Sequence, residues 1–250
     1  TLGIQTALTQ NVVLNSGTLK LSDDLVLADD EFVVGPGTLN TDTRKLHTGN
    51  AALTAATDLT LANTTHINLN APLTLTGTWT CQGAVYINAN GHPIDLTNGT
   101  LAIAAGGTLT IVDAQIKGWI STSITLADGT SKLRLANVDA KLTTSVTYTA
   151  GTVEVFGNSA VTLKSSVWTF SGSSALQVNG AVLTYDTVEY EFVTINAGHI
   201  TSVNGGSLYN VNGTSSGPII ITETSTLTTK FDLDPLNTMT FEPPSADTLV

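Results

Sequence analysis

Apolar residues alternate with Thr, Ser or Asn in short runs along most of the chain, as in LTLT at 73–76, VEV at 153–155 and LQV at 176–178. Runs of this kind, bounded by Gly, Asn or Asp, are typical of short β-strands that bury one face. No long run places apolar residues at i, i+3, i+4 and i+7, and the helix formers Glu, Lys, Arg and Met are scarce. The pattern therefore predicts an all-β fold.

One arrangement of residues recurs: a small or hydroxyl residue, an apolar-x-apolar pair, an Asn or Asp, and another apolar residue. Four copies begin their apolar pairs 20 to 24 residues apart, at Leu109, Leu133, Val153 and Leu176. Upstream, Leu19, Leu39 and Leu59 lie 20 residues apart, and Val85 lies 24 residues before Leu109. Self-similarity at a period of about 22 residues indicates a solenoid.

The residues of each repeat decide which solenoid is expected. The L-x-x-L-x-L-x-x-N frame of leucine-rich repeats is missing, and ankyrin and tetratricopeptide repeats need helices. About 22 residues per round fit three short strands per coil, with Leu, Ile and Val inward and Thr, Ser, Lys and Asp outward. Asn and Gly suit the corners because they tolerate left-handed backbone angles. We therefore expect a single parallel β-helix (β-solenoid) of about 10 coils.

The two ends differ from the middle, because the first 50 residues carry an acidic run and the tail carries four of the 7 prolines. A solenoid needs atypical terminal units, since an end coil presents unpaired backbone groups. We expect residues 1–213 to form the β-solenoid, including an N-terminal cap region. Residues 214–250 are expected to form a strand-rich tail that caps the solenoid or joins subunits.

Residues 68–118 carry a family resemblance. They contain NGHPIDL at 90–96, GGTLTI at 106–111 and a D-A-x-I-K-G run that ends at Gly118. This stretch resembles the repeats of bacterial right-handed parallel β-helix proteins of the cell surface, such as autotransporter passengers, and the likeness extends over about 68–210. The resemblance implies one coil passing into the next. It implies little about activity, because this fold hosts lyases, adhesins and passive fibres alike.

Composition narrows the classes of function. Charged residues make up only 12% of the chain, against about 25% in an ordinary domain, and the formal net charge is −11. Phosphate binding needs clustered Lys and Arg, so we expect no nucleic-acid partner. No apolar stretch approaches the ~18 residues of a membrane-spanning helix, so we expect no membrane insertion. With one cysteine, Cys81, and no signal peptide at TLGIQTALTQ, we expect a processed, exported chain in an extracellular or cell-surface location.

Candidate chemistry is sparse, and we expect no catalytic, cofactor-binding or metal residues. The acidic run from Asp23 to Glu31 could bind Ca²⁺, but it lacks the known calcium-loop frames, so a solvated turn is the simpler interpretation. The Thr-x-Thr arrays, for example at 74–80 and 147–149, would need one shared coil position to bind ice, and their spacings do not match the period. The paired carboxylates that could serve glycoside hydrolysis or polysaccharide lysis are Asp23/Asp24, Asp29/Asp30, Glu189/Glu191 and Asp232/Asp234.

The repeat and the strand-rich tail favour a non-enzymatic structural protein whose subunits assemble into a filament or surface layer. The two ends of a solenoid are natural joining surfaces, either by end-to-end stacking or by strand donation. The partner is then the chain itself, joined head to tail, with a cell-surface polysaccharide as a further candidate. The alternative is a β-helix that binds or degrades polysaccharide. The residues expected to mediate assembly are Ile219, Ile220, Ile221, Val12, Val13 and Leu14.

Overall fold

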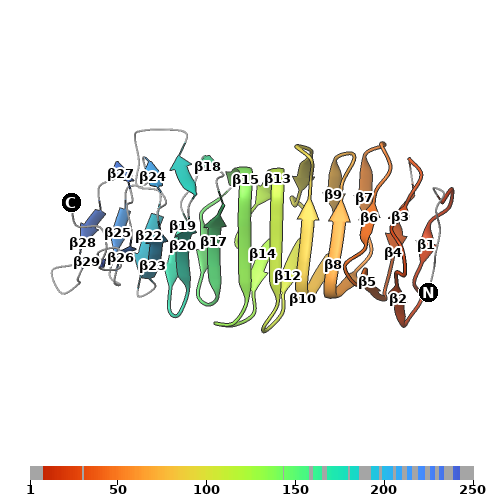
Figure 1. Cartoon of the computed structure of the whole chain (residues 1–250), viewed down its shortest axis with the longest axis horizontal. Coiled ribbons are helices and arrows are strands. Elements are labelled where there is room, and N and C mark those ends of the chain that lie inside the picture. Colours follow the sequence, from red (N-terminus) through yellow and green to blue (C-terminus); the bar gives the residue numbers. More distant parts are fainter. Residues whose placement is uncertain are drawn as a thin grey trace, which may run out of the picture.

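The chain forms one elongated stack of parallel β-strands (Figure 1), with the first strand, β1 (Val12–Val13), and the last, β29 (Met239–Glu242), towards opposite ends. The computed structural model describes residues 8–29, 31–142, 144–157, 160–164, 168–179 and 181–185. After these it describes only the strands between Val193 and Glu242. It gives the backbone alone for Lys141, for the strand Ala160–Lys164 and for every strand after Ala181. About seven turns are described with their side chains, and no helix lies within the described residues. The predicted all-β fold and parallel β-solenoid are confirmed.

The strands are short in the first coils and longer in the middle of the chain. The first set is β1 (Val12–Val13), β2 (Thr18–Lys20), β3 (Leu25–Val26), β4 (Val33–Val34), β5 (Thr38–Asn40), β6 (Lys45–His47) and β7 (Leu53–Ala55). The central set is β8 (Leu59–Asn68), β9 (Leu73–Leu75), β10 (Thr78–Asn88), β11 (Pro93–Asp95), β12 (Thr100–Ile103), β13 (Thr108–Trp119), β14 (Ile124–Leu126) and β15 (Lys132–Leu142).

The remaining strands continue the stack towards the C-terminus. They are β16 (Val146–Tyr148), β17 (Thr152–Phe156), β18 (Ala160–Lys164), β19 (Trp168–Ser171), β20 (Ala175–Asn179), β21 (Val182–Tyr185), β22 (Val193–Asn196), β23 (His199–Asn204), β24 (Ser207–Tyr209), β25 (Gly213–Ser215), β26 (Ile219–Thr222), β27 (Thr226–Thr228), β28 (Phe231–Leu233) and β29 (Met239–Glu242).

Each coil contributes inward side chains to three columns that run along the stack, so the expected three strands per coil are present. The first column is Leu19, Leu39, Leu61, Cys81, Ile103 and Leu126. The second column is Leu25, Leu46, Ile67, Ile87, Ile111, Leu135, Val155 and Val178. The third column is Leu53, Leu73, Ile94, Ile116 and Ala140.

The three columns meet inside the coil and form one continuous apolar core. Most of its members are less than 5% exposed, because each aliphatic side chain packs against the coils above and below it as well as across the coil. Aromatic rings join the same core, with Phe32 stacked on Trp79 at 5.5 Å and Trp119 edge-on to Trp168 at 5.5 Å. Stacking of this kind makes each coil dependent on its neighbours for burial.

The register confirms the predicted repeat where the motif is strongest. Leu109 pairs with Leu133, Leu133 with Val153, and Val153 with Leu176. Val85 pairs with Leu109, as the spacing indicated.

The prediction for Leu59 is wrong by two residues. Leu39 pairs with Leu61, and Leu59 pairs with Trp79. The upstream leucines also belong to a different side of the coil from Leu109, because Leu19 and Leu39 are in the first column. Corner segments of variable length shift the chain between columns, so a constant step cannot follow one column throughout.

The tail strands continue the parallel pairing. β26 pairs with β23 on one side and β29 on the other, with Ile219 opposite Ile200 and Met239, and β24 pairs with β27. Ile220 and Ile221 are therefore opposite Thr240 and Phe241 in an internal strand. The role of residues 214–250 in capping or joining subunits stays a prediction.

No helix in the described part of the chain is long and apolar enough to cross a membrane.

Candidate functional site

Polar side chains line one corner of the solenoid, between the second and third columns. This polar corner consists of Asp29, Asn50, Asn70, Asn90, Asp113 and Asn137. At the last two positions a single long strand bends through the corner, because Asp113 and Asn137 adopt positive φ angles of 52° and 53°. Asp and Asn are the non-glycine residues that most readily take this conformation. The Asn/Asp position of the sequence repeat thus becomes a corner, as predicted.

Hydrogen bonds across the polar corner tie each coil to the next. The Asn50 side-chain amide donates to Asp29 Oδ1 at 3.1 Å, and the Asn90 amide donates to the Leu69 carbonyl at 2.7 Å. Asn137 Nδ2 donates to Asp113 Oδ1 at 3.0 Å. These side chains replace ladder hydrogen bonds where the backbone leaves strand geometry, so the coils remain joined through the corner.

A groove of about 590 Å³ lies on the polar corner in the middle of the molecule. Its floor is made by two buried apolar residues, Ala114 and Val138, which pair across β13 and β15. Its polar lining comes from three successive coils and consists of Asn90, Asp113, Gln115, Asn137 and Asp139. No lysine, arginine or histidine is among the described residues that line this groove.

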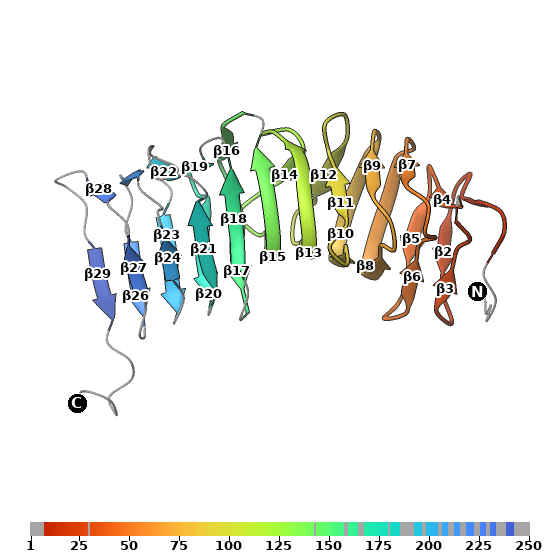
Figure 2. The same ribbon diagram turned by 90° about the horizontal axis from the view of Figure 1, so that it is seen from above.

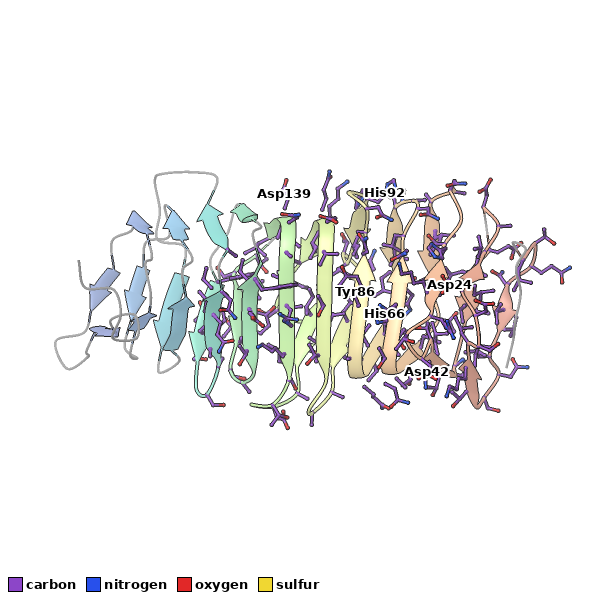
Figure 3. All side chains as sticks on the ribbon, viewed as in Figure 1. Asp24, Asp42, His66, Tyr86, His92 and Asp139 are labelled. Carbon is purple, nitrogen blue, oxygen red and sulfur yellow. The ribbon has the colours of Figure 1, made fainter. Side chains whose placement is uncertain are left out.

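Two stacked rings lie on the neighbouring face of the solenoid. His66 and Tyr86 pair across β8 and β10, and their ring centroids are 5.5 Å apart. Figure 3 shows the two rings midway along these strands, with Asp139 near the upper end of β15. Partial burial raises the pKa of the Tyr86 phenol, and the nearby Asp113 carboxylate raises it further. Tyr86 pairs with Thr110 of β13, three residues before the groove residue Asp113.

The same face carries an ionic cluster of Lys132, Arg134, Glu154 and Asn179, of which Glu154 is buried. Glu154 is 2% exposed, and its carboxylate contacts Lys132 Nζ at 2.7 Å and Arg134 Nε at 2.8 Å. Asn179 Nδ2 donates to the other oxygen at 2.8 Å. Desolvation raises the pKa of Glu154, but hydrogen bonds from Asn179, Lys132 and Arg134 outweigh it, so the pKa lies below its usual value. The cluster joins three coils and resembles a structural clamp rather than a reactive centre.

The acidic run that raised the possibility of a calcium site is spread over two corners. Asp24 accepts the Lys45 N–H at 2.9 Å, and Asp29 accepts the Asn50 N–H at 3.0 Å. Among the described residues, no three His, Cys, Asp or Glu side chains gather in a group that could hold a metal ion. Each of these two carboxylates joins its coil to the next. Asp30, Asp234 and the paired acids Glu189/Glu191 lie outside the described residues, and of Asp232 only the strand backbone is described.

The tryptophans and the cysteine are part of the core. Trp79, Trp119 and Trp168 are no more than 1% exposed, so they pack inside the coil. Cys81 is fully buried in the first column, and burial raises the pKa of its thiol to about 12.

One set of threonines does share a coil position, although the Thr-x-Thr arrays singled out from the sequence are not aligned with one another. It lies beside the first column and consists of Thr18, Thr38, Thr60, Thr80 and Thr125, with Ala102 between the last two. Spacing between Thr-x-Thr arrays missed this column because the arrays lie on different sides of the coil.

The N-terminal coil exposes apolar groups. Val13 is 59% exposed and Val26 is 40% exposed, and these are the large hydrophobic residues that are exposed among the described ones. In the part of the chain that the structure describes, β1 pairs only with β4 and β2 only with β5. Val12 is partly buried against the core and Leu14 is 8% exposed. Of Val12, Val13 and Leu14, the expected assembly residues whose side chains are described, Val13 is the most exposed.

No protein-family model, curated protein or solved structure matches this chain. The resemblance of residues 68–118 is supported by the structure at the level of the fold, a parallel β-solenoid. The comparisons do not support a particular family of surface proteins.

Sequence reasoning missed the groove and the ionic cluster as sites. The signal was present for the cluster, because Lys132 and Arg134 flank Leu133 and Glu154 follows Val153 in two aligned repeats. Residues on either side of an inward position share the outward face, so alignment of the repeats places opposite charges on one surface.

Proposed function

We propose that the chain is a non-enzymatic structural protein: an extracellular β-solenoid subunit that assembles head to tail into a filament or surface layer. The observation that carries the proposal is the N-terminal coil, where Val13 and Val26 are exposed and described strands β1 and β2 are paired on one side only. Open strand edges with exposed apolar side chains are a template for pairing with another chain.

End-to-end stacking is favoured over donation of residues 219–221. β26 already pairs with β23 and β29, so its release would break pairings on both sides. A stacked contact instead extends the columns of one subunit into the next, and such a contact does not close on itself. The low content of charged residues and the Thr-rich outward positions support a location outside the cell or on its surface.

The acids of the first coils support a structural rather than a catalytic role. Asp24, Asp29 and Asp58 each accept a backbone N–H from the following coil at 2.7 to 3.0 Å. They lie at different corners and act as separate clasps between coils.

The test is sedimentation velocity over a range of concentrations, together with negative-stain electron microscopy. We expect the wild-type chain to form fibres or sheets, and Val13→Asp to shift it towards monomer, because a charge is placed on the N-terminal coil next to the open edge of β1. Gln82→Asp is the matched control, since it adds the same charge to an exposed position of central strand β10. A wild-type chain that stays monomeric at every concentration contradicts the proposal.

A further inference from the structure

The groove on the polar corner is a preformed site that the structural role does not use. Its volume of about 590 Å³ lies within the range of about 300 to 1,000 Å³ that is common for ligand sites. The bend at Asp113 and Asn137 fixes its shape, and the Asn137–Asp113 hydrogen bond of 3.0 Å ties its two central coils together. The bend and this hydrogen bond shape the groove in the absence of a ligand.

The chemistry of the lining indicates the ligand. Two carboxylates, Asp113 and Asp139, and three amides, on Asn90, Gln115 and Asn137, surround a small apolar floor. Carboxylates accept hydrogen bonds from hydroxyl groups, and amides both donate and accept. A ligand with many hydroxyl groups and an apolar ring face fits this lining, because its hydroxyl groups can bond to the carboxylates and amides and its ring face can pack on the apolar floor.

The charge of the site separates neutral from acidic ligands. The described residues that line the groove include two carboxylates and no cationic side chain, and the whole chain carries a net charge of −11. A uronate or sulfate group placed there would be repelled and would find no partner. On the neighbouring face, the Tyr86 ring stacks on His66 and pairs with Thr110 of β13, the strand that carries Asp113 and Gln115. It offers a half-buried aromatic surface for the adjoining part of a ligand.

We propose that this groove binds a segment of a neutral polysaccharide, with hydroxyl groups on the Asp113, Gln115 and Asp139 side chains and a sugar ring against Tyr86. The groove runs across coils, along the direction in which subunits would stack. Assembly and binding use different surfaces, so each can fail without the other.

The test uses the full chain in native affinity gels that contain galactomannan, xyloglucan or mixed-linkage glucan, with polygalacturonate as the acidic counterpart. We expect at least one neutral polysaccharide to retard the protein and polygalacturonate to leave it unaffected. The best neutral polysaccharide is then titrated calorimetrically as its hexasaccharide.

Variants locate the site. Gln115→Ala and Asp139→Asn should each weaken the affinity about tenfold, the loss of one or two polar contacts, and Tyr86→Phe should keep more affinity than Tyr86→Ala. Gln115 is exposed, so its replacement leaves the core intact, and Gln82→Ala on the far half of β10 is the control. Retardation by no neutral polysaccharide, retardation by polygalacturonate alone, or unchanged affinity in Gln115→Ala would each overturn the proposal.

Discussion

At the scale of single residues, Glu154 is a charged side chain buried on the outward face of the solenoid. It is an outward-facing side chain of β17, yet it is 2% exposed, because Lys132, Arg134 and Asn179 surround it. The Arg134 guanidinium also lies 4.0 Å from the centre of the Phe156 ring. A buried carboxylate is tolerated only when its oxygens are satisfied, so the cluster depends on all of its members.

Replacement of Glu154 should therefore destabilise the folded protein. We expect Glu154→Ala to lower the free energy of unfolding by about 2 kcal/mol, less than for a fully buried pair because Lys132 and Arg134 are a third exposed. Glu154→Gln keeps an acceptor and should lose about 1 kcal/mol. Urea unfolding at pH 7 measures both, and equal stability of Glu154→Ala and wild type would show that the clamp contributes nothing.

The same residue predicts a dependence on pH. Because the folded-state pKa of Glu154 lies below the unfolded value of about 4.3, its contribution is present above that value and is lost as pH falls towards the folded pKa. The difference in stability between wild type and Glu154→Gln should then shrink between pH 6 and the acid range. Urea unfolding at a series of pH values tests this, and a constant difference would contradict it.

At the scale of elements, the corners decide how closely the coils can stack. One corner, just before the strands of the second column, is made of small residues. Each lies two residues before one of the aligned residues Leu109, Leu133, Val153 and Leu176, and they are Gly107, Ser131, Gly151 and Ser174. A Cβ on Gly151 would lie 2.8 Å from the Ser131 carbonyl oxygen. Ser131 and Ser174 are less than 2% exposed and donate to carbonyls of the coil before them, at 3.0 and 2.9 Å. Only small or hydrogen-bonding residues fit at this corner.

Two glycines allow this crowding to be measured. Gly151 and Gly157 have similar positive φ angles of 76° and 71°, but a Cβ on Gly157 would meet no atom within 4 Å. We expect Gly157→Ala to lower the free energy of unfolding by about 1 kcal/mol, because only the left-handed backbone is strained. Gly151→Ala should lower it by about 3 kcal/mol, since the preceding coil must also move. Thermal or urea unfolding compares them, and equal losses would mean that the corner can relax.

The strands could be predicted from the sequence, but the lengths and positions of the corners could not. The alternation of Leu, Val and Thr identified the strands, and the aligned residues Leu133 and Val153 are paired as predicted. Leu59 was placed wrongly because the segment before it differs in length from its neighbours, which the inward pattern does not encode. The groove was missed because Asn90, Asp113 and Asn137 converge only once the register of three coils is known.

At the scale of the whole molecule, burial is weaker at the N-terminal end than in the middle. Leu14 and Leu19 are each 8% exposed, whereas Leu39 and Leu61 are completely buried. The view from above (Figure 2) shows the coils side by side along one axis, so each has neighbours only before and after it. The stability of such a stack is the sum of contacts between adjacent coils, and its ends open first.

This gradient predicts the pattern of amide hydrogen exchange. In the unassembled protein, the amides of β2 should exchange at least tenfold faster than those of β10, which pairs on both sides with β8 and with β12 and β13. Under assembling conditions the exchange of β2 should slow while that of β10 stays the same. Exchange followed by mass spectrometry measures both, and β2 amides as slow as those of β10 before assembly would contradict the gradient.

The pairing of Leu109, Leu133 and Val153 bears on the length of the molecule. Leu109, Leu133 and Val153 are equivalent points on consecutive turns. Removing residues 109–132 takes out one full turn and joins two equivalent points, so the chain should close up with every remaining side chain on its original side. The particle would become shorter by about 4.8 Å, the distance between neighbouring strands, while both of its tips keep their native residues.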